Sequence, residues 1–240
     1  MGADRADRLD SRQAHDSAGI DWTRRLALSQ WRLQRRDARI DRNEVNKAKL
    51  FKELAGEAAA CTRCPAMCGR TAVLSELNGS PDARVMFVGE APGRKGADRT
   101  RVPFSGDQSG ANLDRFLNSI DLKREEIFIT SAALCNPRSE SGANRKPMQK
   151  ELQNCSEFLR RTIELVDPRV IVTLGSVALE ALKRIQYHEL NLKESAARIH
   201  SWNGRVLVPI YHPSPQVLAS HRREAEQLQD YQVVKKAINR

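Results

Sequence analysis

The stretch Ala83-Arg-Val-Met-Phe-Val-Gly-Glu-Ala-Pro-Gly93 is the part of this sequence from which the fold can first be inferred. Its first six residues form a short apolar run that predicts a buried strand, and Gly89 ends that strand. Three further apolar runs have the length of a strand. They cover residues 127–134, 170–174 and 206–211.

Helical patterns separate these runs, at about residues 109–120, 147–166 and 176–186. Strands that alternate with helices are typical of a mostly parallel sheet with helices on both faces. We therefore expect an α/β fold, a three-layer sandwich in which helices flank a central four-stranded sheet. Ligands of such sheets bind beyond the carboxyl ends of the strands.

The composition favours a nucleic-acid partner. The chain has 240 residues, with 40 Lys and Arg against 30 Asp and Glu, so its formal net charge is +10. A basic balance of this kind suits a polyanion better than an acidic surface. No apolar run is long enough to span a membrane, and the N-terminus lacks the apolar core of a signal peptide, so we expect no membrane partner and a cytoplasmic location.

Residues 1–46 differ from the rest, because they are rich in Arg and poor in Gly and Pro. Trp22, Leu26 and Trp31 could form an apolar stripe on a helix, so we expect an extension that is partly helical or disordered. It could be an arm that contacts DNA, but its mixed charges favour a solvated helix with a frayed tail. The globular domain is expected over residues 47–240.

Four of the five cysteines have the arrangement of a metal site. Cysteines in a cytosolic chain are more often metal ligands or buried thiols than disulfides. A Cys-x-x-Cys pair can bind one metal, and two later cysteines could complete the set, for tetrahedral zinc or for an iron–sulfur cluster. The candidates are Cys61, Cys64, Cys135 and Cys155, with Cys68 as a rival.

Two turns rich in Gly and Pro follow the first and last predicted strands. In the first, Gly89–Gly93, the glycines let the backbone approach a ligand closely. Beyond it, Phe104 lies between a proline and a Ser-Gly pair, as either an aromatic platform or a loop anchor. In the second, prolines hold the backbone beside His212, which could aim its imidazole at a ligand.

These motifs together resemble the uracil-DNA glycosylase superfamily over roughly residues 55–235. The motifs are Gly89-Glu-Ala-Pro-Gly93, Pro103-Phe-Ser-Gly106, Cys135 before an Asn-Pro loop, Asn144-Arg-Lys-Pro147, Cys155, Asp167-Pro-Arg-Val-Ile-Val-Thr-Leu-Gly175 and His212-Pro-Ser214. The iron–sulfur branches of this superfamily, families 4 and 5, carry a cluster on four cysteines. The resemblance therefore implies a structural [4Fe–4S] cluster, rather than zinc, on Cys61, Cys64, Cys135 and Cys155; Cys68 has no counterpart.

The resemblance also implies how residues act on DNA. His212 would donate a hydrogen bond to the uracil O2, and Phe104 would stack on the flipped base. The predicted catalytic residues are His212, Asp107 and Glu90; the base-binding residues are Phe104, Ala91, Gly93, Ser131 and Asn136; and the DNA-contacting residues are Ser214, Pro215, Gln216, Val217, Arg94 and Arg145.

The implied activity is that of a monofunctional DNA glycosylase, which hydrolyses the N-glycosidic bond of uracil and starts base excision repair. The expected protein is a monomer associated with the nucleoid of a prokaryote. Ser131 stands where family 4 has an Asn, while Asp107 resembles family 5, so the range of bases stays open. The alternative is a non-catalytic module that binds damaged DNA with the same fold and cluster.

Overall fold

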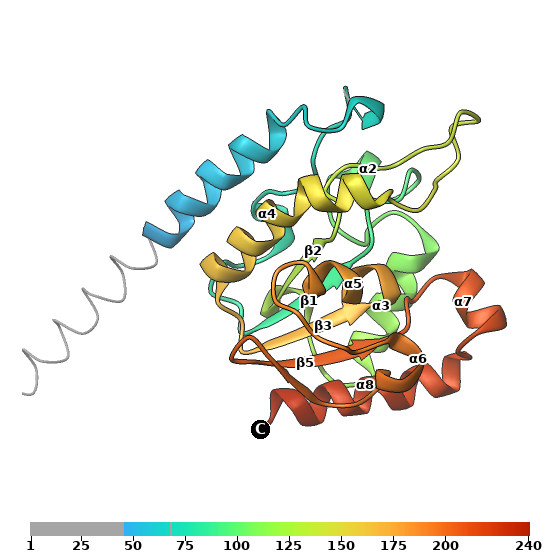
Figure 1. Ribbon diagram of the computed structural model, residues 1–240. Helices are drawn as coiled ribbons and strands as arrows, with labels where there is room; N and C mark the ends of the chain where they lie inside the picture. The colour runs from blue at the N-terminus through green and yellow to red at the C-terminus, as the bar shows by residue number, and fades with distance from the viewer. Residues whose placement is uncertain (1–45, 68) are drawn as a thin grey trace, which may run out of the picture. The chain divides into compact units, whose positions relative to one another are not determined.

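The computed structural model describes residues 46–67 and 69–240, and a five-stranded sheet forms its centre (Figure 1). The strand order is β2-β1-β3-β5-β4. The parallel strands are β1 (Val85–Gly89), β2 (Ile127–Ser131), β3 (Val170–Leu174) and β5 (Arg205–Ile210). The predicted α/β class with a mostly parallel sheet is confirmed.

The predicted number of strands was too low by one. A short strand, β4 (His200–Trp202), pairs antiparallel with β5 at the edge of the sheet. Only Trp202 of this strand is buried, so three residues give neither an apolar run nor a clear alternation. The strand exists because a tight turn at Asn203 and Gly204, both with positive φ, folds it back on β5.

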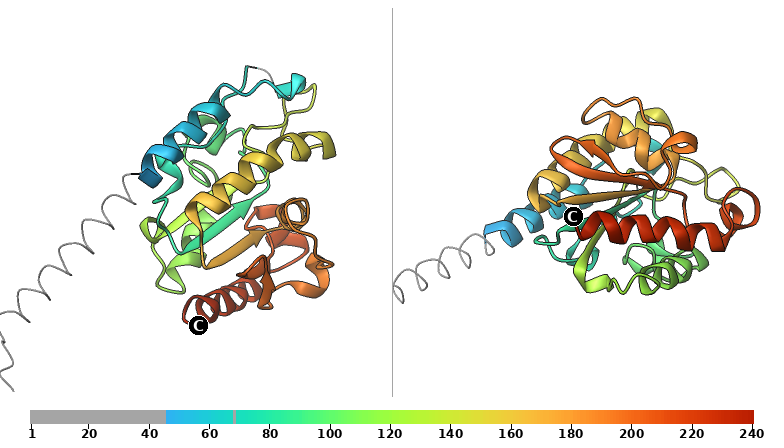
Figure 2. Two further views of the ribbon diagram at one scale, coloured as in Figure 1. Left: turned by 60° about the vertical axis from the view of Figure 1, so that its left-hand side comes forward. Right: turned by 90° about the horizontal axis from the view of Figure 1, so that it is seen from below.

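Helices cover both faces of the sheet (Figure 2). Residues 46–59 are helical and share one apolar cluster with α4 (Gln149–Val166), α5 (Ser176–Lys183) and sheet residues such as Met86. Helices α3 (Gln108–Asn118) and α8 (Glu224–Ile238) share the other cluster with sheet residues such as Phe87. Alternate strand residues thus face opposite helical layers, as the period of a strand requires.

The remaining elements are short and lie in the connections. They are α2 (Ala97–Thr100), α6 (Leu192–Ser195), α7 (Pro215–Ser220) and the 3₁₀ turns η1 (Pro65–Met67), η2 (Glu76–Asn78) and η3 (Arg124–Glu126). None of the helices in the described ranges is long and apolar enough to cross a membrane. The predicted extension lies outside the described residues, except for its last position.

The sheet fixes where the functional loops meet. Gly89 at the end of β1 lies opposite Ser131 at the end of β2, and Leu174 at the end of β3 lies opposite Ile210 at the end of β5. Parallel strands end at the same edge, so the segments that follow them gather there. Residues far apart in the sequence, around positions 90, 131 and 212, therefore become neighbours.

Candidate active site

A pocket of about 390 Å³ opens at the carboxyl edge of the sheet. It brings together most of the predicted catalytic, base-binding and DNA-contacting residues. Those that line it are Glu90, Ala91, Gly93, Phe104, Asp107, Ser131, Asn136, Arg145, His212, Ser214, Gln216 and Val217. Arg94 and Pro215 do not line it. The volume lies in the range of small-molecule sites in proteins.

Phe104 holds a strained position at this pocket. Its φ is 49°, in the left-handed region that bulky residues rarely adopt. The guanidinium of Arg124 donates hydrogen bonds to the carbonyls of Pro103, at 2.9 Å, and of Phe104. The ring lies so close to the end of β1 that a Cβ on Gly89 would come within 2.7 Å of it. Phe104 thus anchors its loop by the backbone and presents its half-buried ring to the pocket.

Asp107 joins the same loop to helix α3. It is the N-cap of that helix, and its Oδ1 accepts a hydrogen bond from the backbone N–H of Gly110 at 3.0 Å. Its Oδ2 faces the turn after β1, where a Cβ on Gly96 would lie only 2.2 Å away. A side chain at position 96 would therefore displace the carboxylate.

Glu90 is the second carboxylate of the pocket. Partial burial raises the pKa of this group, and the nearby ammonium of Lys146 opposes that rise. Lys146 also lines the pocket, and within the described residues it forms no ion pair. Within the described residues, the ammonium of Lys146 is thus a cation of the pocket without an ion pair. It lies near the Glu90 carboxyl group, whose raised pKa means that this group protonates more readily than usual.

Ser131 and Asn136 lie in the pocket but are not equally available to a ligand. The Ser131 hydroxyl makes no hydrogen bond to any described residue. The amide of Asn136 is fully occupied: its Nδ2 donates to the Pro92 carbonyl at 2.6 Å and to Asn144 Oδ1 at 3.0 Å, while its Oδ1 accepts from Arg138 at 2.7 Å. The role predicted for Asn136 in base binding stays a prediction.

These contacts form a brace behind the turn after β1. Arg138 also pairs with Asp98, whose side chain is only 9% exposed. Asn144 accepts a second hydrogen bond from the backbone N–H of Arg94 at 3.0 Å. The segment after β2 is thus tied to the turn from Pro92 to Asp98, which fixes the backbone that lines the pocket.

His212 also lines the pocket, and its ring centroid lies 5.5 Å from that of Phe104. Part of the side chain stays open to the pocket. Because the protein surrounds the imidazole, loss of hydration lowers its pKa to about 4, although the charge of Asp107 opposes this shift. The imidazole is therefore neutral at pH 7 and carries one N–H donor.

The predicted DNA-contacting segment forms helix α7 at the mouth of the pocket. Ser214 is its N-cap, with Oγ accepting from the Val217 N–H at 3.4 Å, and Pro215 occupies the first turn. None of the side chains in this helix is buried. An exposed, capped helix of this kind can meet a large ligand without unfolding.

The two predicted arginine contacts lie in different surroundings. Arg94 is exposed beside the turn after β1. Arg145 binds the buried carboxylate of Glu151 through two hydrogen bonds of 2.8 and 2.6 Å, and it also donates to the Arg138 carbonyl at 3.1 Å. Most of its donors are thus already used inside the protein. Its neighbour Lys146 has the freer charge.

The cysteines come from three separate segments. Cys135 follows β2, Cys155 lies in α4, and Cys61 and Cys64 follow the helix at 46–59. Burial, and to a smaller extent the charges of Cys155, Cys61, Cys64 and Asp98, raise the pKa of Cys135 to about 12, so the other three thiols lie near Cys135. The side chain of Cys68 lies outside the described residues.

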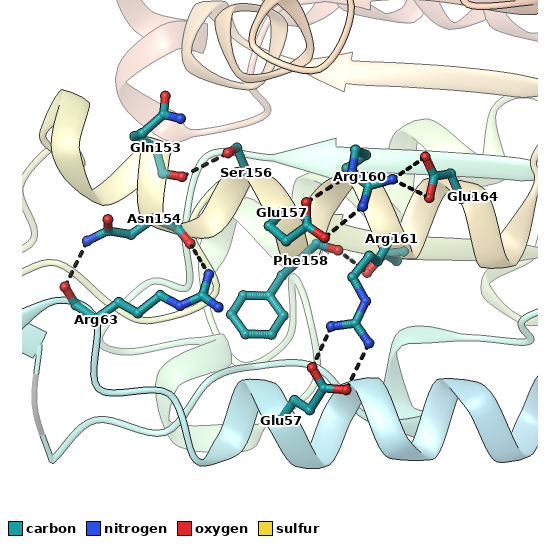
Figure 3. A network of polar contacts seen from close by, with 11 residues as sticks. Glu57, Arg63, Gln153, Asn154, Ser156, Glu157, Phe158, Arg160, Arg161 and Glu164 are labelled. Carbon is teal, nitrogen blue, oxygen red and sulfur yellow. Dashed lines mark hydrogen bonds and ion pairs between the residues drawn. The ribbon is translucent and has the colours of Figure 1, made fainter.

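Polar contacts join α4, which contains Cys155, to the segment that contains Cys61 and Cys64 (Figure 3). Asn154 Nδ2 donates to the carbonyl of Arg63 at 2.8 Å and approaches Cys64 Sγ at 3.3 Å. Arg63 lies over the ring of Phe158, 5.2 Å from its centroid, and Arg161 pairs with Glu57. Asn154, which precedes Cys155, thus binds Arg63, which precedes Cys64.

Four cysteine thiols are a donor set that either tetrahedral zinc or an iron–sulfur cluster can use. No three His, Cys, Asp or Glu side chains in the described ranges are grouped to hold a metal ion. The iron–sulfur cluster on these thiols therefore stays a prediction.

Several residues of the site were not among the predicted ones. Lys146 and Asn144 belong to the Asn-Arg-Lys-Pro motif, which could have indicated them. Arg124 and Arg138 carry no clear local signal, because Arg124 binds the carbonyls of Pro103 and Phe104, 21 and 20 residues away, and Arg138 pairs with Asp98, 40 residues away. Such residues can be found only once the fold has placed the carbonyls and carboxylates they bind.

Comparison with known proteins agrees with this geometry. A family model described as the uracil DNA glycosylase superfamily matches residues 78–235. The matched range contains the pocket-lining residues, apart from Val73, and ends within α8.

Individual relatives are similar over most of their length. A type-4 uracil-DNA glycosylase of Thermotoga maritima is 31% identical over 169 residues, which cover 70% of this chain and 83% of the relative. One of Saccharolobus solfataricus is 33% identical over 193 residues, covering 78% and 85%. A type-5 uracil-DNA glycosylase of Pyrobaculum aerophilum is 30% identical over 196 residues, covering 70% and 84%.

Proposed function

This chain belongs to the uracil-DNA glycosylase superfamily, and from that premise we propose that it hydrolyses the N-glycosidic bond of uracil in DNA and so starts base excision repair. The observation that carries the proposal is the pocket in which Phe104, Asp107 and His212 meet. An aromatic ring, a carboxylate and a neutral imidazole are the groups that this hydrolysis needs. Since the substrate is DNA, we expect the protein to act at the nucleoid.

The pocket can take a base only after the base has left the duplex. Extruding a base costs a few kcal/mol, and contacts with the flipped nucleotide and the gap it leaves must offset that cost. The half-buried ring of Phe104 offers a stacking surface inside the pocket. Helix α7 begins at Pro215, three residues after His212, and none of its residues is buried, so we propose that it fills the gap in the duplex.

His212 would stabilise the departing base. Breaking the bond leaves negative charge on the uracil and positive charge on the sugar, as in other glycoside cleavages. With a pKa of about 4, the imidazole is neutral at pH 7 and would donate its single N–H to the departing base. A fixed donor aimed at developing negative charge typically contributes about 3 kcal/mol to catalysis.

The two carboxylates would act on the other side of the bond. Asp107 is held as an N-cap by the Gly110 N–H, and its second oxygen faces the turn after β1. A carboxylate there can orient a water molecule and face the sugar cation. Glu90 has a raised pKa because of burial, so it is suited to accept the proton of that water.

Ser131 would set the range of bases. Its hydroxyl is unpaired within the described residues and can either donate or accept a hydrogen bond. A single rotating hydroxyl discriminates less than a fixed amide, and the amide of Asn136 is already occupied. We therefore propose that related deaminated bases are also accepted.

The four cysteines would hold a [4Fe–4S] cluster. When bound, the cluster supplies cross-linking of the protein rather than chemistry at the base, since hydrolysis transfers no electrons. Cys135 immediately precedes Asn136, whose side chain holds the Pro92 carbonyl. The thiols thus support the loop that braces the pocket.

An assay on oligonucleotides tests the proposed function. Protein loaded with iron and sulfide is incubated with duplexes that contain one uracil, hypoxanthine or xanthine, and with an unmodified duplex as the control. We expect an abasic product from the uracil duplex without strand cleavage until alkali is added. Intact uracil DNA after incubation with loaded protein would rule the proposal out, and a product from uracil alone would rule out the wider base range.

A further inference from the structure

Two buried amides hold the backbone of the loop that carries His212. Asn112 of α3 donates from Nδ2 to the Pro213 carbonyl at 2.8 Å. Gln227 of α8 donates from Nε2 to the His212 carbonyl at 3.3 Å. The two side chains are only 2% and 1% exposed, and neither lines the pocket.

The orientation of the Asn112 amide is fixed by its other partners. Its Oδ1 accepts hydrogen bonds from Gln108 Nε2 and from Arg115 Nη2, each at 3.1 Å. Turning the amide over would set its NH₂ group against these two donors. The Nδ2 must therefore point toward the Pro213 carbonyl, and the contact is the shorter of the two that hold the loop.

Helix α3 thereby connects both sides of the pocket. Asp107 caps its N-terminus, and Asn112 follows five residues later, a rise of about 7.5 Å along the axis. The same helix also fixes Phe104, because Asp114 binds the arginine that holds the Phe104 carbonyl. A rigid helix thus sets the Asp107 carboxylate and the backbone after His212 relative to each other.

We propose that Asn112 is a positioning residue for His212, which fixes the imidazole through the Pro213 carbonyl at the distance from Phe104 and Asp107 that base release requires. This inference rests on the proposed glycosylase function. Asn112 reaches neither the base nor the water, so it acts only through the loop. Its loss should impair the cleavage step and leave the binding of DNA unchanged.

The magnitude follows from the sensitivity of catalysis to position. A displacement of about 1 Å at a catalytic group can cost 100-fold in rate, so a loosened loop should cost about 10- to 100-fold. Gln227 still holds the neighbouring carbonyl in such a variant, which keeps the loop folded. The loss should therefore be smaller than that caused by removing the imidazole.

The test compares Asn112→Ala and Asn112→Asp with Asn118→Ala. Asn112→Asp keeps the size of the side chain but has no donor for the Pro213 carbonyl. Asn118 is an exposed asparagine of the same helix and is the matched control. For each protein, single-turnover excision of uracil and the Kd for uracil DNA are measured. Both Asn112 variants should excise about 10- to 100-fold more slowly with an unchanged Kd, and Asn118→Ala should match the wild type.

Combining these changes with His212→Ala separates positioning from a general loss of structure. If Asn112 acts through the imidazole, Asn112→Asp should slow excision no further once the imidazole has been removed. An equal loss in both backgrounds, or wild-type rates in Asn112→Asp, would overturn the inference. A wild-type protein that leaves uracil in place would instead overturn the proposed function.

Discussion

The pocket and the cysteine site are both assembled from distant segments, but different contacts hold them. Around the pocket, the buried amide of Asn112 and the partly buried guanidinium of Arg124 donate to backbone carbonyls. Around the cysteines, the links between segments are mostly exposed, such as the pair of Arg161 and Glu57. Buried hydrogen bonds are costly to break, whereas exposed ion pairs contribute little. The pocket is thus preorganised by its own side chains, whereas the cysteine site would depend on the proposed cluster.

Removing one cysteine thiol should lower stability more than any other change proposed here. It tests whether the cysteine site depends on a bound cluster. Cys155→Ala should abolish the brown colour and the absorbance near 400 nm that are expected of an iron–sulfur protein. It should also lower the free energy of unfolding by about 4 kcal/mol, if the cluster binds at about a thousandfold excess over its Kd. Iron content and urea unfolding measure the two effects.

The matched control for this change is Ser156→Ala, at the next residue of α4, which is half-buried and whose hydroxyl donates to the Gln153 carbonyl of the same helix at 2.8 Å. It should keep the iron and the stability of the wild type. If wild type and Cys155→Ala contain equal amounts of iron, the cysteine site does not hold the cluster in the proposed way.

Removing the imidazole tests the first half of the comparison. His212→Ala should slow uracil excision by about 100-fold, equivalent to about 3 kcal/mol, because a fixed donor to the departing base is lost. Binding of DNA should change little, since phosphate contacts dominate affinity. Single-turnover kinetics and a binding titration distinguish the two.

His200→Ala is the control for this variant, because His200 lies in the edge strand β4 and does not line the pocket. It should excise uracil at the wild-type rate. A His212→Ala protein with full activity would show that the pocket does not use the imidazole.

The stability of the protein should also depend on pH through His212. The pKa of this group falls from 6.5 in the unfolded chain to about 4 in the folded protein, so the unfolded state binds the extra proton as the pH drops below 6.5. Between pH 7 and pH 5 the wild type should lose about 2 kcal/mol more stability than His212→Gln, which does not titrate. Urea unfolding at both pH values measures this. Equal losses in the two proteins would mean that the imidazole is hydrated in the folded state.

The smallest effect is expected at the exposed pair beside the cysteines. Arg161→Ala removes the pair with Glu57 (Figure 3), and it should lower the Tm by no more than about 2 °C. Arg145→Ala, which would leave the buried Glu151 carboxylate without its partner, should lower it clearly more. A larger effect of Arg161→Ala would mean that surface ion pairs, not the thiols, hold this region together.

Much of the fold could be predicted from the sequence. Four apolar runs gave four of the five strands, and the three predicted helices lie within about one turn of α3, α4 and α5. Strand β4 was missed because three residues carry no periodic signal. Helix α8 was not predicted either, since its buried face includes polar residues such as Gln227 and Asp230 that hide the apolar stripe.

The residues of the pocket could also be predicted from the sequence. Which of them have side chains free to bind a ligand could not. Motifs after the strands indicated Glu90, Phe104 and His212, and the parallel sheet brings them to one edge. The sequence did not indicate that Glu151 occupies Arg145 or that three partners occupy Asn136. Those facts depend on which groups meet across the fold.

The sequence by itself thus determined the class of fold, the order of the motifs and the chemical groups present, because apolar periodicity and residue type are local properties. Only the tertiary structure decided which polar groups are already satisfied and which remain free for a ligand. Asn112 and the Pro213 carbonyl are 101 residues apart, and their hydrogen bond exists only because α3 and the loop after β5 pack at the same edge of the sheet. A buried donor must find a partner, and the packing of the chain selects that partner.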